Sequence, residues 1–236
     1  MSYKTELHCH SRTVSACASI TPAEIAEKYL ENGYTTVVLA DHFSPSTFSS
    51  KRYTGGENWQ NKVDYYMEGV RALREAAAGR LHILQGCELR IEHCPSDFLV
   101  YGMTEEFMRQ NPDLLQISKV KEMCARLREA GFLVFQAHPF RNNMTITDPD
   151  YLDGIEVYNA HGRHNSRNDF AQIWAEKYGL LPISGSDIHH DYDLPGGGIL
   201  TDEPIERMEQ LIQILREGRY TLLREGRPGD DNTKRK

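Results

Sequence analysis

Short apolar segments alternate with longer amphipathic segments along nearly the whole chain, and this alternation restricts the fold more than any other feature. Seven short segments have the length and composition of strands, and they lie at 6–11, 35–40, 81–89, 97–102, 131–138, 154–159 and 180–186. Between them the apolar spacing predicts helices at 21–33, 59–79, 114–131, 166–179 and 204–218. Apolar strands separated by helices are typical of a parallel α/β fold. The pattern alone fits a closed barrel and a doubly wound sheet equally well.

The predicted helices begin and end at residues that favour those positions. Thr21 is placed to cap the first helix, with Pro22 next and Glu24 completing a capping box. A glycine follows each predicted helix, as is common at helix C-termini, at Gly33, Gly79, Gly131, Gly179 and Gly218. No repeat or low-complexity linker interrupts the series, so we expect one domain over 1–224 and a polar tail over 225–236.

Composition narrows the functional classes. The 236 residues carry a formal net charge of −7, which argues against binding long nucleic acid. No apolar run has the length of a membrane span or a signal peptide, so no membrane partner is expected. Five cysteines without a CxxC pair favour a reducing compartment, and we expect a cytoplasmic protein. Nothing in the sequence decides the oligomeric state.

Polar residues gather where the predicted strands end. Six of the seven strands deliver a His, Asp, Glu or Asn at the C-terminal end: His8 and His10, Asp41 and His42, Glu88, His138, Asn159, and Asp187 with His189. In a parallel barrel these ends meet on one face, where active sites are built. A doubly wound sheet would not gather six strand ends around one centre. The placement therefore favours the barrel.

This gathering also predicts a metal centre. One histidine on an apolar strand is more often a satisfied core residue than a ligand. Unpaired buried carboxylates are costly, however, and here several histidines and two carboxylates would share one barrel mouth. Imidazole and carboxylate ligands without paired thiolates suit zinc, manganese or iron in an open, catalytic site.

The motifs HCHS, ADH, CE, AHP and SDIH, in this order at strand ends, resemble the PHP (polymerase and histidinol phosphatase) family over residues 6 to 200. The resemblance implies a distorted seven-stranded β/α barrel that hydrolyses phosphoesters with two or three divalent metal ions. It implies one ion on His8, His10, Glu88 and Asp187. It also implies a second ion that Glu88 shares with His138, and a third on His42 and His189.

Two positions depart from the family pattern. Relatives often carry a His or Asp shortly after the first motif, where this chain has VSACAS, so Cys17 is the candidate replacement. A small buried hydrophobe is the equal alternative for Cys17. Relatives with three ions also use a His from the fourth strand, which here exits into YGMT. Asp97 lies at the entrance of that strand, and we expect it at the wrong end of the barrel.

Phosphoester hydrolysis by such a cluster uses a metal-bridging hydroxide as nucleophile. Nearby cations would meet the remaining phosphate charge, and Arg suits this role because its fork binds two oxygens. The candidates are Arg141, shortly after His138, and Arg163, His164 and Arg167 in the loop after 154–159. For each arginine, a solvated surface charge is an equal alternative. His161 is a candidate general acid, with a hydrogen-bonding loop residue as the alternative.

Three functions fit these residues. The first is a metal-dependent phosphoesterase acting on a small phosphomonoester, such as histidinol phosphate or a nucleotide. The second is hydrolysis of a C–N or C–O bond on an amidohydrolase-like barrel, but no strand end here carries the lysine that would favour it. The third is a non-catalytic metal-binding domain. A polymerase-linked nuclease is weaker, because no polymerase is attached and the chain is acidic.

Overall fold

The computed structural model describes residues 2–225, and most of the expected polar tail, 226–236, lies outside this range. The described strands form one sheet, ordered β10-β9-β1-β2-β4-β5-β6-β7-β8, with β3 paired to β4. Their bounds are β1 (Tyr3–Cys9), β2 (Tyr34–Leu39), β3 (His42–Phe43), β4 (His82–Leu89), β5 (Phe98–Tyr101), β6 (Leu133–Gln136), β7 (Gly154–Asn159), β8 (Leu181–Gly185), β9 (Ile199–Thr201) and β10 (Thr221–Leu222).

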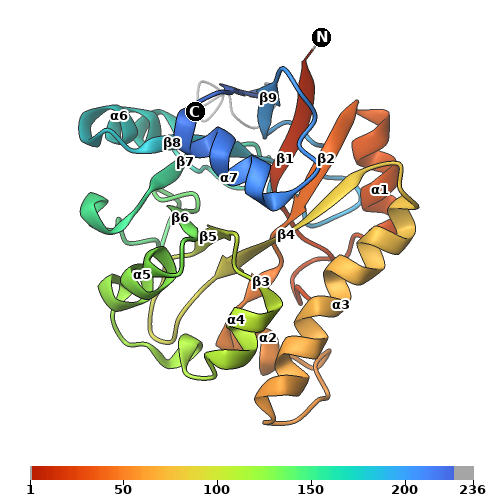
Figure 1. Cartoon of the computed structure of the whole chain (residues 1–236), viewed down its shortest axis with the longest axis vertical. Helices are drawn as coiled ribbons and strands as arrows, with labels where there is room; N and C mark the ends of the chain where they lie inside the picture. The colour runs from red at the N-terminus through yellow and green to blue at the C-terminus, as the bar shows by residue number, and fades with distance from the viewer. Residues whose placement is uncertain (1, 226–236) are drawn as a thin grey trace, which may run out of the picture.

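The sheet curls until its first and eighth strands meet, so that it forms a nearly closed barrel (Figure 1). The segment after β8 pairs with β1 in parallel through a bridge between Cys9 and Ile188. The Asp187 N–H donates to the His8 carbonyl at 2.7 Å, and the His10 N–H donates to the Ile188 carbonyl at 3.2 Å. This junction is called the seam below. The predicted barrel class is confirmed, with ten strands rather than seven among the described residues.

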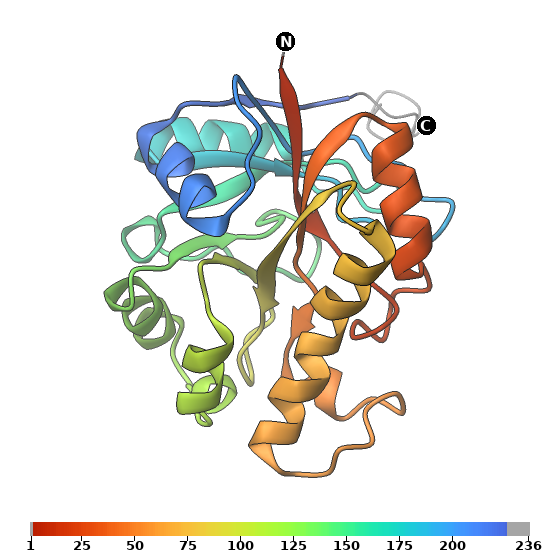
Figure 2. The same cartoon turned by 45° about the vertical axis from the view of Figure 1, so that its right-hand side comes forward.

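Helices cover the outside of the barrel, with α1 and α3 side by side on one flank (Figure 2). Their bounds are α1 (Pro22–Glu31), α2 (Pro45–Phe48), α3 (Trp59–Ala77), α4 (Glu105–Gln110), α5 (Val120–Glu129), α6 (Asn168–Tyr178) and α7 (Met208–Glu217), with short 3-10 turns at Leu114–Gln116 and Pro149–Tyr151. The capping box of Thr21 and Glu24 is present. The helix expected over 114–131 is instead a 3-10 turn followed by α5.

One of the seven predicted strands runs against the direction that the alternation predicted. β5 is antiparallel to both β4 and β6, because only eight residues join β4 to β5. A parallel crossover needs a dozen or more residues, so a chain this short can only turn back. As a result the entrance of β5 lies beside the exit of β4, and the expectation that Asp97 lies at the wrong end is wrong.

The barrel interior is apolar beneath the site. Leu7, Val38, Leu99, Phe135 and Ile183, from five strands, belong to one buried cluster that also includes side chains of α7. Burying each such side chain contributes about 1.5–3 kcal/mol. A second cluster fills the space between the sheet and the outer helices. The polar strand ends therefore rest on a packed floor.

Candidate metal centre

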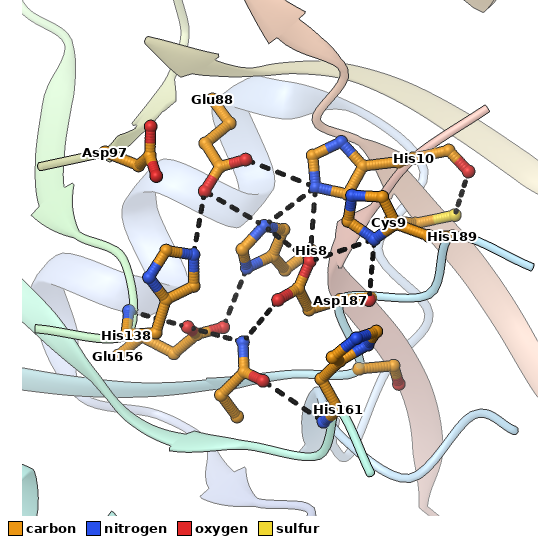
Figure 3. A network of polar contacts seen from close by, with 12 residues as sticks. His8, Cys9, His10, Glu88, Asp97, His138, Glu156, His161, Asp187 and His189 are labelled. Carbon is orange, nitrogen blue, oxygen red and sulfur yellow. Dashed lines mark hydrogen bonds and ion pairs between the residues drawn. The ribbon is translucent and has the colours of Figure 1, made fainter. Parts of the chain in front are cut away.

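Seven side chains predicted as metal ligands lie at one end of the barrel. They come from β1, β3, β4 and the segments that follow β1, β6 and β8, and they are His8, His10, His42, Glu88, His138, Asp187 and His189. Five of them are buried, while His42 and His189 are half-buried. Figure 3 shows Glu88, His138, His8, His10, Asp187 and His189 directed toward one another.

Glu88 lies between four imidazoles. Its Oε1 is 3.1 Å from His138 Nε2 and 3.4 Å from His8 Nε2. Its Oε2 is 2.8 Å from His42 Nδ1 and 3.3 Å from His10 Nε2. A carboxylate in this position can share its two oxygens between neighbouring ions.

Asp187 faces two ways. Its Oδ1 is 3.5 Å from His8 Nε2, 3.4 Å from His10 Nε2 and 3.4 Å from His189 Nδ1. Its Oδ2 accepts from Arg141 Nη2 at 2.7 Å. Asp187 has φ 54° and His138 has φ 28°, both in the left-handed region that side-chain-bearing residues rarely adopt. Such strain is stored at functional sites when the surroundings hold it in place.

Three buried carboxylates that the sequence did not single out as site residues support the cluster. Glu156 accepts from His8 Nδ1 and from the His138 N–H, both at 2.9 Å. Asp41, placed at a strand end but given no role, accepts from Ser15 Oγ at 2.6 Å, and Ser15 Oγ lies 3.2 Å from His10 Nδ1.

Glu6 is the third supporting carboxylate. It accepts from the backbone N–H groups of His8 and Ser186, at 2.8 and 2.9 Å, and so spans the seam. Glu6 and His8 lie two residues apart on β1 and His10 directly follows that strand, so this spacing of two was the signal that could have identified Glu6.

The charges of the cluster reinforce one another. Burial would raise the pKa of Glu88, but the charges of His42 and His8 hold that pKa well below its usual range. Burial likewise opposes ionisation of Asp187, yet His8 and Arg141 hold its pKa well below the usual value. Burial would lower the pKa of His8, but Asp187, Glu156 and Glu88 raise it well above its usual value. An ion entering this site must displace protons, so its binding weakens as the pH falls.

His189 differs from the other imidazoles. Burial and then the charge of His10 lower the pKa of His189 to about 2, so its ring is neutral. A neutral imidazole offers a lone pair to a metal ion without first losing a proton.

The residues present fit divalent metal ions. Within the described chain, four groups have ligand atoms within 4.8 Å of one another: His10, His42 and His189; His8, His10 and Glu88; His8, His138 and Asp187; and His42, Glu88 and Asp97. Glu88 Oε2 is buried and makes no hydrogen bond of normal geometry, although His42 Nδ1 lies 2.8 Å away. Because Glu156 lies 2.9 Å from His8 Nδ1 and favours a proton on that nitrogen, His8 Nε2 can bind an ion once the ring has lost its second proton.

Asp97 is the residue that the reversed strand adds to the site. Its two oxygens accept from Arg90 Nε and Nη2, each at 2.6 Å, across the β4–β5 hairpin. The guanidinium therefore already neutralises this carboxylate. An ion bound through His42, Glu88 and Asp97 would have to compete with Arg90.

Cys17 lies at the edge of the same site. Cys17 is exposed, and together with His42 it lines a cavity that opens over the cluster. Burial of the sulfur raises its pKa, but the hydrogen bond and charge of His42 outweigh burial, and the pKa lies below its usual value. Cys17 is in none of the four groups with ligand atoms at metal-binding separation. Its predicted role as a ligand remains a prediction.

A cavity of about 260 Å³ opens over the cluster, lined in part by Arg141, His161, Arg163 and His164. Arg141 Nη2 also contacts Asn159 Oδ1 at 3.0 Å, while its buried Nε has no hydrogen-bond partner. Arg163 is at the exposed rim, paired with Asp193 at 3.2 Å. Three of the four predicted substrate-binding residues and His161 are thus beside the cluster.

Arg167 takes a different place from the other predicted substrate-binding residues. It is not among the residues that line the cavity. Its guanidinium donates to the Phe140 carbonyl and to Asn142 Oδ1, both at 2.5 Å. It therefore holds the loop that follows His138.

His161 is buried at the cavity wall, and its Nδ1 has no hydrogen-bond partner. Burial lowers the pKa of His161 to about 4 despite the nearby charge of Asp187. The ring is therefore neutral near pH 7, and the role of His161 as general acid remains a prediction.

Fold and site together define a metal-binding α/β barrel with its polar cluster at the strand ends. The PHP domain family model matches residues 6–222, and the chain therefore belongs to the PHP domain family. No curated protein sequence matches the chain. In the part of the chain that the structure describes, no helix is long and apolar enough to cross a membrane.

Solved structures share this fold at low sequence identity. One is a two-domain protein from Bacteroides vulgatus containing a predicted PHP-like metal-dependent phosphoesterase; it has TM-score 0.64 and 16% identity, with 95% of this chain covered but only 65% of that protein. A lesion-specific endonuclease from Pyrococcus furiosus has TM-score 0.65 and 16% identity, covering 94% of this chain and 58% of the other. An amidohydrolase from Chromobacterium violaceum, with bound sulfate and no metal, has TM-score 0.53 and 16% identity, covering 94% and 98%.

Proposed function

We propose that this chain is a metal-dependent phosphoesterase that hydrolyses a small phosphomonoester. The observation that carries the proposal is the position of the Asp187 carboxylate. Its Oδ1 faces the histidine cluster, while its Oδ2 binds Arg141. A phosphoryl group bound over the cluster would lie beside this guanidinium, which can bind two of its oxygens. Membership in the PHP family supports the same class of reaction.

The proposed ligands are those implied by the family resemblance, and the geometry is compatible with them. Glu88 would be shared by two ions, because its oxygens face His138 and His8 on one side and His10 and His42 on the other. Two or three zinc, manganese or iron ions suit this imidazole and carboxylate set. When bound, such ions lower the pKa of a coordinated water and neutralise charge on the phosphoryl group.

The surrounding side chains would orient the substrate. Arg141 would hold the phosphoryl oxygens, since one edge of its guanidinium is fixed by Asp187 and Asn159. Arg163 and His164, both exposed at the rim, would meet the leaving group. The cavity of about 260 Å³ is smaller than the roughly 300–1,000 Å³ typical of pockets for drug-sized ligands, which favours a small ester.

A panel of substrates tests the proposal. Purified protein with added Mn²⁺ or Zn²⁺ is expected to release phosphate from small phosphomonoesters such as histidinol phosphate and nucleotides. Glu88→Gln serves as the matched inactive variant. Cleavage of lesion-bearing DNA without phosphate release from any monoester would contradict the proposed substrate class.

Hydrolysis of a C–N or C–O bond is the second candidate, and the description of one structural neighbour as an amidohydrolase favours it. Against it, none of the predicted strand ends carries a lysine. Adding amide and lactone substrates to the same panel separates the two candidates. A non-catalytic metal-binding domain would turn over none of these compounds even when fully metal-loaded.

A further inference from the structure

The outward face of α6 is unusually apolar for an exposed helix. Among the described residues, five large hydrophobic side chains are exposed, and three of them lie on this one helix. Phe170 is 57% exposed, Ile173 61% and Tyr178 43%, while the other two, Tyr192 and Leu194, follow His190 in a loop. Phe170 and Ile173, three residues apart, share one side of the helix, which is called its outward face below. Tyr178 is turned about 140° from Ile173 and packs on Trp174, with ring centroids 4.5 Å apart. Neighbouring exposed hydrophobic side chains mark interaction surfaces, whereas single ones need no explanation.

The inward face of α6 is already used by the fold. Ala171 and Ala175, one turn apart, are buried where the helix packs on β7 and β8. Trp174 lies at the boundary and contacts Phe140 with ring centroids 6.0 Å apart. Figure 1 shows α6 at the outer edge of the molecule, so its outward side is open in the described chain.

The charges on this face have a pattern that is complementary to itself. Asp169 and Lys177 are both exposed and lie four residues before and after Ile173. Residues four apart share one face of a helix, so the three form a row with Ile173 in the middle. If two copies of α6 pair antiparallel about a two-fold axis at Ile173, each Asp169 meets the Lys177 of the other copy. Parallel pairing would instead place like charges together.

We propose that the outward face of α6 is a dimer interface through which two copies of this chain associate antiparallel. A symmetric dimer uses the same patch on both subunits, which is what a self-complementary row provides. The chain's own C-terminal residues are a poorer occupant, because 226–236 contain no aromatic, Leu, Ile, Val or Met side chain. This inference does not depend on the proposed enzymatic function.

The size of α6 limits the strength of the association. Eleven residues extend about 16 Å, so the patch is smaller than the roughly 800 Å² per partner of a standard stable interface. We therefore expect a reversible dimer with a dissociation constant of roughly micromolar magnitude.

Sedimentation equilibrium over about 1–200 µM chain, a range spanning that expected dissociation constant, tests the proposal. The average mass of the wild type should rise toward twice that of the chain. Ile173→Glu should stay monomeric throughout the range, because the substitution buries a charge at the centre of the interface. Leu194→Glu is the matched control, since it places the same charge on a similarly exposed side chain that is not on α6, and it should dimerise like the wild type.

Charge reversal tests the antiparallel arrangement. Asp169→Lys or Lys177→Asp alone turns two attractive pairs into repulsive ones and should raise the dissociation constant roughly tenfold. The double reversal should return it to within about twofold of the wild type. Because these charges also favour the helix dipole, thermal unfolding of each variant must confirm that it is folded during the assay.

Three results would overturn the inference. The first is a wild type that stays monomeric over the whole range. The second is equal behaviour of Ile173→Glu and Leu194→Glu. The third is a double reversal that associates no better than either single reversal.

Discussion

Replacing Glu156 by Gln should weaken metal binding although Glu156 is itself no proposed ligand. Its Oε1 accepts from His8 Nδ1, and its Oε2 accepts from the His138 N–H and from Asn159 Nδ2, all at 2.9 Å. A glutamine presents only one oxygen to these three donors. If that oxygen serves His138 and Asn159, the amide NH₂ faces His8 Nδ1, which must then become an acceptor.

The magnitude of the effect depends on which ring nitrogen of His8 carries the proton. With Nδ1 as acceptor, a neutral His8 carries its proton on Nε2, the atom that faces Glu88 and Asp187, and the lone pair needed by an ion is lost. In the opposite orientation the amide NH₂ group faces the His138 N–H and Asn159 Nδ2, which are two buried donors. Loss of a supporting carboxylate typically lowers metal affinity 10–100-fold, which is about 1.4–2.7 kcal/mol. Glu156→Ala leaves His8 Nδ1 and the His138 N–H without their acceptor, while Asn159 Nδ2 keeps Asp187, and it should also destabilise the apoprotein by at least about 2 kcal/mol.

Competition with a chromophoric zinc chelator at pH 7.5 measures the affinity directly, without relying on turnover. Asp153→Asn is the matched control. Asp153 directly precedes β7, the strand that carries Glu156, and its carboxylate accepts from the Val134 N–H at 2.8 Å, away from the cluster. We expect a 10–100-fold weaker affinity for Glu156→Gln and a change below about twofold for Asp153→Asn. Zinc binding by a folded Glu156→Gln variant within twofold of the wild type would refute the reasoning.

Four further predictions concern the site. Glu88→Gln should lose far more phosphoester turnover than Arg163→Ala, since Glu88 faces four imidazoles while Arg163 is at the rim; similar losses in steady-state kinetics would contradict the bridging role. Arg141→Ala should weaken competitive inhibition by inorganic phosphate by about 1.5–3 kcal/mol, and an unchanged inhibition constant would place the phosphate elsewhere. If Cys17 binds an ion, a thiol reagent should label it faster in the apoprotein than in the metal-loaded protein, and equal rates would exclude that role. The pKa of His161 is lowered to about 4 in the folded protein, so the unfolded chain binds this proton at a higher pH than the folded chain does. As the pH falls from about 6.5 to 4, the wild type should therefore lose roughly 2–3 kcal/mol more free energy of unfolding than His161→Gln, as measured by urea unfolding.

The barrel and the gathering of histidines could be predicted because both depend on repeated local patterns. Strands buried on both faces and separated by helices require a parallel α/β arrangement, and polar side chains at their ends must then meet on one face. His8, His138 and Asp187 come from segments far apart in sequence, yet each was identifiable from its position after an apolar run.

The direction of β5 and the role of Glu156 could not be read from those patterns. Residue type and periodicity are the same for a strand running either way, so Asp97 was assigned to the wrong end. The length of the connection held the missing information, since eight residues cannot make a parallel crossover. Glu156 lies inside an apolar strand, and only the tertiary structure shows that its oxygens reach His8 and His138.

The seam has a consequence for how the barrel forms and opens. β4 and β5 form a hairpin in which Leu89 pairs with Phe98, whereas the seam joins Glu6 to Ser186, which are 180 residues apart in sequence. Closing a loop costs more entropy as the loop grows, so the hairpin strands can pair early while the seam closes late. His8 and Asp187 lie on opposite sides of the seam, and an ion held by both would act only once the barrel has closed. Metal loading should therefore slow unfolding while leaving the rate of folding nearly unchanged.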